Sequence, residues 1–335
     1  EYDNLLEVLE IKLDLKYQMS EYGAFITGIN NIEPLDNSYW FSLYVNDAMS
    51  NVGVMDVEIK DNLKIDFKLS SMKSAIDFTL DVLLYDFINK DLSNYISDSK
   101  IDYYVFAGYQ KMTKFNASLS KVSTLVTTTG VESMFPGIDN LGQAFRAAIY
   151  YKALKIDTSS VMTYLDGQSV TPGAYAVYSY YPLAIAKYLI DQTVDTVHLD
   201  QLAAEVNIAD ADYAGMALQA LSIDQVKYAS RIAVLVDYLK TNVSAGGYLD
   251  YLASPSAAST AQGVLGLVSV GLNPSNIEGI NVIEALMAFK KDGGFSNKLD
   301  GNVDMLFATP QVYSALMAYK VFNDTYLNPS TSLYF

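Results

Sequence analysis

The segment from Ser254 to Leu272, SPSAASTAQGVLGLVSVGL, decides the fold that this sequence predicts. A turn containing Ser and Pro leads into a helix made largely of Ala, Gly, Ser, Val and Leu. A second copy, DMLFATPQVYSALMAYK, runs from Asp304 to Lys320, and a Gly-Gly-aromatic turn precedes each copy, at Gly246–Tyr248 and Gly293–Phe295. The chain therefore repeats a helical unit.

Weaker copies of this unit lie upstream, at Gly173–Leu189 and Ala209–Ser222. Leu218, Leu265 and Leu316 recur at intervals of roughly 45 to 50 residues, a spacing typical of paired-helix repeats. Helices whose facing sides carry Ala, Gly and Ser can approach one another closely. We therefore expect stacked helical hairpins that leave a concave end where loops meet a ligand.

Composition limits the classes of function. The chain has 335 residues, 51% of them apolar, so it can bury a large core. Lys and Arg number 22 against 38 Asp and Glu, and this net charge of -16 repels a phosphate backbone, which argues against a nucleic-acid partner. The absence of cysteine excludes disulfides, thiolate zinc sites and a cysteine nucleophile. No apolar run is long enough to predict a membrane span.

The periodicity changes from strand-like to helical near Ser70. Alternating apolar residues predict strands over Tyr39–Val45 and Leu63–Leu69, with a further strand-like run at Tyr22–Ile29 and a helix near Asn4–Leu15. Residues 1–70 are therefore predicted to form a small β-rich α+β domain.

Residues 71–335 show helical periodicity throughout, and we predict about twelve helices there. The fold class is then mainly α, with an α/α toroid following the N-terminal domain. The predicted helices are 75–96, 103–114, 117–126, 140–156, 160–165, 175–190, 199–206, 213–223, 224–239, 257–270, 277–289 and 310–322.

The N-terminal sequence resembles a known module. Residues 22–69, YGAFITGINNIEPLDNSYWFSLYVNDAMSNVGVMDVEIKDNLKIDFKL, are similar to the DUF4430-type β-domain of the transcobalamin and intrinsic factor family. The helical part resembles the barrel of the same family, which is also the barrel of terpene cyclases and prenyltransferases. The resemblance rests on SYY at 179–181, ADYAGMALQAL at 211–221, the segment from GGY to STAQ at 246–262, and KDGGFSN at 291–297, taken in this order.

The sequence also departs from that family. The β-domain comes first here, whereas the barrel precedes it in the vertebrate carriers, and the family's opening strand is absent before Glu1. Pro182 stands where the family has a Gln that contacts the corrin, and Ala209 stands where transcobalamin has a cobalt-binding His. We therefore expect no protein ligand on cobalt. The resemblance to surface modules predicts an extracellular or cell-surface protein, with any export signal or membrane anchor outside the given chain.

Enzymatic alternatives lack their motifs. The acidic runs Asp210–Asp212 and Asp300–Asp304 are not the Asp-rich motifs of terpene cyclases, and a prenyltransferase zinc site requires cysteine. His198 is the only histidine, and a lone histidine beside a helix is more often structural than catalytic. We therefore predict a protein that is not an enzyme, with no catalytic residue, no metal site and no required cofactor.

The resemblance implies a ligand, cobalamin or a related corrinoid, captured between the two domains. Two interpretations stay open for Trp40, which either packs in its own domain or lines the cleft, and for Asp212, which either caps a helix or contacts the ligand. The alternative function is a surface adhesin or a protein- or glycan-interaction module without a small ligand. The candidate ligand-binding residues are Trp40, Tyr180, Tyr181, Asp212, Asp250, Tyr251, Thr260 and Gln262.

Overall fold

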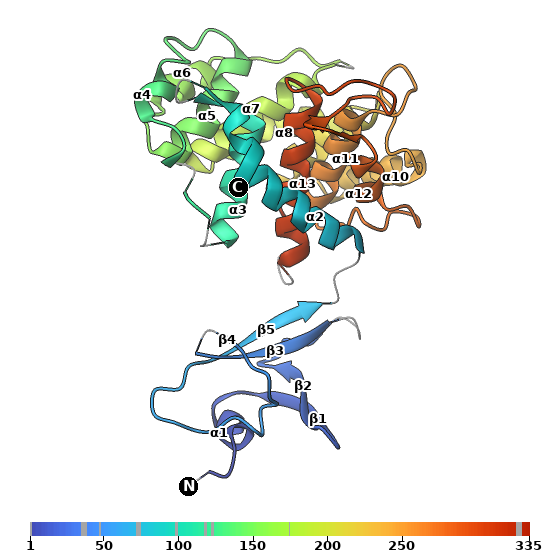
Figure 1. The fold of residues 1–335 in the computed structure, drawn as a ribbon. Coiled ribbons are helices and arrows are strands. Elements are labelled where there is room, and N and C mark those ends of the chain that lie inside the picture. The colour runs from blue at the N-terminus through green and yellow to red at the C-terminus, as the bar shows by residue number, and fades with distance from the viewer. Residues whose placement is uncertain are drawn as a thin grey trace. The chain divides into compact units, whose positions relative to one another are not determined.

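The structure is a computed structural model that describes residues 2–34, 39–46, 48–71, 75–97, 100–116, 119–121, 124–173, 175–325 and 330–335. These residues form two compact units, Glu1–Asp77 and Phe78–Phe335. About half of the chain is helical, and the β-rich region lies at the N-terminus (Figure 1). The prediction of a mainly helical chain with a small N-terminal β region is confirmed at this level.

The N-terminal unit contains one helix and two small sheets. Strand β3 lies between β4 and β5 in one sheet, and β1 pairs with β2 in the other. Leu5, Leu9 and Ile26 are buried in its core, against which Phe41 and Leu43 of β3 pack. The elements are α1 Leu5–Lys12, β1 Leu15–Ser20, β2 Gly23–Ile29, β3 Tyr39–Val45, β4 Ala48–Met49 and β5 Ile65–Ser71.

Beyond β5, the regular structure of the described residues is helical apart from two short strand pairs. Six helices form one set: α3 Tyr103–Phe115, α5 Leu141–Leu154, α7 Val177–Asp191, α9 Ala211–Leu221, α11 Ala257–Ser269 and α13 Ala308–Asp324. The helices between them are α4 Thr128–Glu132, α6 Ser159–Asp166, α8 Thr196–Ala204, α10 Ala229–Asn242 and α12 Val282–Met287. The remaining elements are α2 Ala75–Asp86, π-helix η1 Phe87–Asp91, 3-10 helices η2 Leu92–Tyr95 and η4 Ser222–Asp224, and strands β6 Ile96–Ser97, β7 Lys100–Ile101, β8 Lys290–Lys291 and β9 Gly294–Phe295.

The first set of six helices packs in cyclic order. Helix α3 contacts α5, α5 contacts α7, and the series continues through α9, α11 and α13, which returns to α3. Helices α6 and α8 each contact the two members of the set that they connect. We call α3, α5, α7, α9, α11 and α13 the ring helices (Figure 1).

Glycines bring α9 and α11 into direct backbone contact. A Cβ added at Gly215 would lie 2.2 Å from the main-chain oxygen of Gln262, and one added at Gly266 would lie 2.7 Å from the Cα of Gly215. No side chain fits in that space, so both positions require glycine. The expectation that the small-residue repeat permits close helix approach is confirmed.

Two predicted helices differ most from the structure; in addition, the helix predicted over 277–289 is an α-helix only over Val282–Met287, and the one predicted over 224–239 begins at Ala229. The segment 117–126 has no α-helix in its described residues; residues 117, 118, 122 and 123 lie outside them. Its Ser and Thr side chains compete with helical hydrogen bonds, as the Thr124 hydroxyl does by donating to the Lys121 carbonyl. The helix predicted over 75–96 ends as an α-helix at Asp86 and continues as η1 and η2. Helix α4 and strand β1 were not predicted.

Candidate functional site

The N-terminal ends of the ring helices are joined by side-chain hydrogen bonds. Ser259 in the first turn of α11 donates to the carboxylate of Asp212 in the first turn of α9, at 3.0 Å. Asn297, in the loop before α13, accepts from Ser256, the N-cap of α11, at 3.0 Å. These bonds bring together loops that lie 40 residues or more apart in sequence, as the predicted repeat requires.

Gln262 is the centre of a buried amide network one turn below these ends. Its Nε2 donates to the Gln311 side-chain oxygen at 3.0 Å and to the Tyr104 hydroxyl at 3.2 Å. Its own oxygen accepts from Nε2 of Gln219 at 3.0 Å. Gln262 therefore connects four ring helices: α3, α9, α11 and α13.

Tyr181 extends this network through the ring. Its hydroxyl donates to the Gln219 oxygen at 3.4 Å and lies 2.8 Å from the hydroxyl of Tyr334, in the C-terminal segment 330–335. Burial raises the pKa of both tyrosines well above the ordinary value, so both hydroxyls stay protonated at neutral pH. The network therefore carries no formal charge, although it offers both donors and acceptors.

Asp212 is an ionisable group outside this network: it accepts from Ser259, and its charge acts on Tyr104 of the network. Burial raises its pKa to about 6, and the nearby charge of Asp210 adds to the shift, whereas the bond from Ser259 opposes it. The interpretation of Asp212 as a helix cap is wrong. Asp210 is the N-cap of α9 and accepts from the Tyr213 amide at 2.8 Å.

Exposed apolar side chains occur in the loops that lead into several ring helices. Tyr175 and Tyr178 stand at the start of α7, Tyr251 and Leu252 precede α11, and Leu306 and Phe307 precede α13. Tyr251 is 81% exposed and Leu306 is 93% exposed, although each belongs to a residue type that is usually covered. We call these six residues, Tyr175, Tyr178, Tyr251, Leu252, Leu306 and Phe307, the rim.

The predicted site residues do not all lie at the N-terminal ends of the ring helices. Tyr181 and Gln262 belong to the buried amide network, and Asp212 is bonded to Ser259. Tyr251 belongs to the rim. Tyr180 is fully buried, and its ring lies 6.0 Å from the ring of His198 in α8, away from the network.

Three other predicted residues have local structural partners. Asp250 pairs with Lys298 at 2.5 Å, and this pair keeps the pKa of Asp250 below its ordinary value despite burial. The hydroxyl of Thr260 accepts from the Tyr248 amide at 3.0 Å and thereby holds the Gly-Gly-aromatic turn. Trp40 lies in the N-terminal unit, opposite Ser70 in the sheet and on the strand face away from Phe41.

The surroundings of His198 agree with the prediction that it has a structural role. It is buried, and its Nδ1 lies 2.8 Å from Asp195, which also pairs with Lys187 at 3.2 Å. In the part of the chain that the structure describes, no three His, Cys, Asp or Glu side chains are grouped to hold a metal ion.

Sequence reasoning missed Gln219, Gln311, Tyr104 and Tyr334. A single Gln within an otherwise apolar helix was the available signal, since a buried amide needs partners. Gln219 occupies such a position in ADYAGMALQAL, and Gln311 in TPQVYSAL. No pattern in the sequence identified Tyr334.

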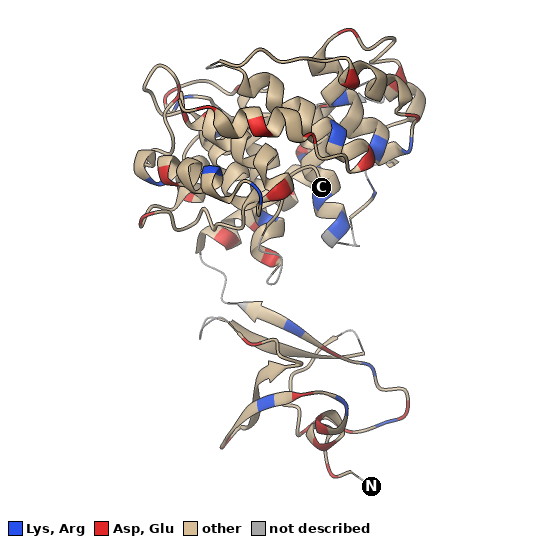
Figure 2. Cartoon of the chain, turned by 180° about the vertical axis from the view of Figure 1, so that it is seen from behind, with Lys and Arg blue, Asp and Glu red and all other residues tan. Residues whose placement is uncertain are grey.

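Charged residues do not form a basic stripe over the described helices. Figure 2 shows Lys and Arg spread singly among Asp and Glu. Among the described residues, no helix has the length and apolar character that a bilayer crossing requires.

Comparisons with known proteins identify the N-terminal unit only. No curated protein and no solved structure matches the chain. Residues 3–71 match the family described as a domain of unknown function, DUF4430, which agrees with the resemblance seen in strands β2, β3 and β5.

Proposed function

We propose that this protein is a non-catalytic binding protein whose ring helices hold an amphipathic small molecule at their N-terminal ends. The supporting observation is the combination found there: exposed aromatic and aliphatic rim residues beside a neutral network of amides and hydroxyls. Ligand sites characteristically combine an apolar lining with a few convergent polar groups. Cobalamin or a related corrinoid is the ligand that we propose to test first.

The chemistry of a corrin suits these residues. The macrocycle has broad apolar faces, against which Tyr251, Leu306 and Phe307 would pack, and it carries peripheral amides. Asp212 is largely ionised at pH 7, given its pKa of about 6, and would accept hydrogen bonds from those amides. Gln262 and Gln311 would act only after rearranging, because they already bond to each other.

This choice of ligand rests on a proposed arrangement of the two domains. We propose that the cyclic packing of the ring helices is the inner layer of an α/α toroid, and that the chain is a transcobalamin-like carrier with its β-domain first. The DUF4430 match over residues 3–71 supports the first part of that arrangement. Ala209 and Pro182 offer no side chain to cobalt or to the corrin edge, so the upper cobalt position would keep water or its own substituent. A carrier of this kind would act at the cell surface or outside the cell.

A second candidate is an adhesin or another protein- or glycan-interaction module. It is favoured by the high exposure of Tyr251 and Leu306, because exposed apolar side chains that form a contiguous patch mark protein contacts. In that case, the rim would bind a macromolecule, and the amide network would be structural.

Calorimetric titration of the purified chain with aquocobalamin and cyanocobalamin separates the two candidates. The carrier proposal expects saturable binding of both, and a ligand that binds only the folded state also raises the thermal midpoint with concentration. Absence of binding at high micromolar concentration would reject the corrinoid and leave the interaction module.

Matched substitutions test whether the ligand binds at the N-terminal ends of the ring helices. Leu306→Ala and Asp212→Ala should each weaken binding by about tenfold, the effect of losing roughly 1.4 kcal/mol of contact energy. Val226→Ala is the control, because Val226 is 90% exposed, as Leu306 is, but follows the C-terminal end of α9. Unchanged affinity in both Leu306→Ala and Asp212→Ala would keep the ligand and reject this site.

A further inference from the structure

The C-terminal segment 330–335 lies inside the ring of helices. Tyr334 packs edge-on against Phe145 of α5, with ring centroids 5.5 Å apart, and its hydroxyl lies 2.8 Å from that of Tyr181 of α7. The Thr331 amide donates to the main-chain oxygen of Val268, near the end of α11, at 2.7 Å. Helices α5 and α11 are on opposite sides in the cyclic order of the ring, so a segment that contacts both lies between them.

The segment is almost completely buried there. Thr331, Ser332, Leu333 and Tyr334 are each at most 5% exposed. The interior of the ring is therefore filled at this level by a part of the same chain.

Two features distinguish the segment from an ordinary part of the core. Residues 330–335 belong to no helix or strand, so regular main-chain pairing does not hold them in place. Two of the buried residues, Thr331 and Ser332, are polar, and the Thr331 hydroxyl has no hydrogen-bond partner within the described residues. A buried hydroxyl without a partner is unfavourable, and release of the segment into water would remove that cost.

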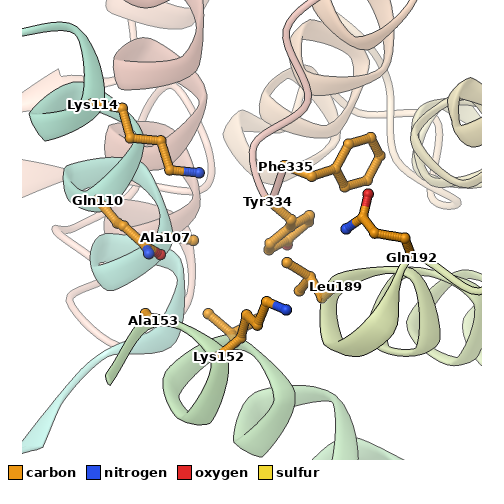
Figure 3. Close-up of a pocket in the computed structure, with 10 residues that line it drawn as sticks. Ala107, Gln110, Lys114, Lys152, Ala153, Leu189, Gln192, Tyr334 and Phe335 are labelled. Carbon is orange, nitrogen blue, oxygen red and sulfur yellow. The ribbon is translucent and has the colours of Figure 1, made fainter. Parts of the chain in front are cut away.

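A cavity beside the segment is a third such feature. It has a volume of about 130 Å³ and lies between the segment and helices α3, α5 and α7 (Figure 3). Tyr334 and Phe335 form one wall, and Ala107 of α3 and Leu189 of α7 are among the residues around it. Lys114 also lines the cavity and is exposed, so the cavity reaches the solvent. Protein cores rarely contain voids larger than a water molecule, so this side of the segment is not packed as a core is.

The ring helices do not depend on the segment for their contacts with one another. Each neighbouring pair, from α3 with α5 round to α13 with α3, packs directly. The Tyr181 hydroxyl also has a partner of its own in Gln219, at 3.4 Å. Release of the segment would therefore leave the ring closed and would expose Phe145 and Tyr181 to its interior.

We propose that the ring interior is a binding site for a short extended peptide, and that residues 330–335 occupy it as a detachable internal ligand. A separate peptide with the order Leu-Tyr-Phe takes their place when they leave. Phe145 and Tyr181 would hold its tyrosine, and the Val268 carbonyl would accept a main-chain bond, which is a combination typical of peptide recognition. The site is independent of the ligand proposed for the N-terminal ends of the ring helices.

Thiol labelling tests whether the segment detaches. The chain has no cysteine, so Ser332→Cys introduces a single thiol, which dithionitrobenzoate reaches only when the segment leaves the ring. Ser314→Cys is the matched control, because Ser314 is a fully buried serine within α13 and becomes accessible only when the ring unfolds. We expect Ser332→Cys to react about tenfold faster or more, with a weaker dependence on urea, because local opening exposes less surface than global unfolding.

An acetylated peptide of residues 330–335 tests whether the opened interior binds a peptide. A ligand of the open ring raises the open population by one plus the ratio of its concentration to its dissociation constant. Peptide at about ten times that constant should therefore speed the labelling of Ser332→Cys about tenfold and leave Ser314→Cys no faster. The same peptide carrying Tyr334→Ala loses the contacts with Phe145 and Tyr181 and should have little effect.

Thr331→Cys provides a second reporter in the segment, and circular dichroism shows whether each variant is folded. Equal labelling rates in Ser332→Cys and Ser314→Cys, with the same urea dependence, would show that the segment is an integral part of the core and would overturn the proposal. Rapid labelling of Ser332→Cys that the peptide does not change would reject the peptide site.

Discussion

Replacement of Asp212 by Asn should stabilise the protein at neutral pH and leave it unchanged in acid. The carboxyl lies partly buried at the start of α9, where burial and the charge of Asp210 raise its pKa from 3.8 to about 6. Asn has nearly the same shape and can still accept the bond from Ser259. The substitution therefore removes the ionisation and little else.

The sign of the pH dependence of stability follows from the protons that the folded and unfolded states bind. Between pH 3.8 and about 6, the folded protein holds a proton on Asp212 that the unfolded chain has lost, so wild-type stability falls as pH rises through this window. A pKa difference of roughly two units corresponds to about 3 kcal/mol, which the remaining access of water reduces to about 2 kcal/mol. Asp212→Asn should therefore exceed wild type by about 2 kcal/mol at pH 7 and match it near pH 4.

Urea unfolding at half-unit steps from pH 4 to pH 7.5 measures this difference, provided the slope of free energy against urea is the same for both proteins. Asp237→Asn is the control, because Asp237 lies exposed on α10 and should give parallel curves throughout. If the difference between Asp212→Asn and wild type does not change across this pH range, the pKa of Asp212 is not raised, and the burial described for its carboxyl is wrong.

Three further substitutions test the packing and the hydrogen bonds by urea unfolding at pH 7. Gly215→Ala should destabilise by about 1 to 3 kcal/mol, because its Cβ forces α9 from α11; no loss would mean that the contact is looser than described. Gln262→Leu should cost about 3 kcal/mol, because buried partners on three helices each lose one bond. His198→Ala should cost about 2 kcal/mol by removing the neighbour of Asp195, and wild-type stability would show that this pair is not structural.

Much of the helical architecture follows from local sequence. Helices α9, α11 and α13 were predictable because small residues alternate with Leu and because turns with Ser, Pro or Asp precede them. The segment 117–126 failed for a local reason as well, since its scattered apolar residues suggest a helix although its hydroxyl side chains prefer turns. The cyclic packing of the ring helices required contacts between α3 and α13, which are far apart in the chain.

The site was predictable only in part. Asp212 and Gln262 stand out because polar groups in apolar helices need partners. The choice of Asp210 as the cap depended on the backbone conformation at the start of α9, and two acids separated by a single residue give the same local signal. Tyr334 joins the network from 153 residues beyond Tyr181, in a segment without periodicity.

The repeat that decides the fold also fixes the dimensions of the candidate site. Gly215 and Gly266 set the separation of α9 and α11, and that separation determines whether Ser259 reaches Asp212 at 3.0 Å. Gln262 lies in the same contact, since its main-chain oxygen faces Gly215 while its side chain links four helices. A glycine that permits close packing thus positions an acid near the N-terminal ends of the ring helices and a buried amide one turn further in. The proposed site and the helix packing therefore depend on the same residues.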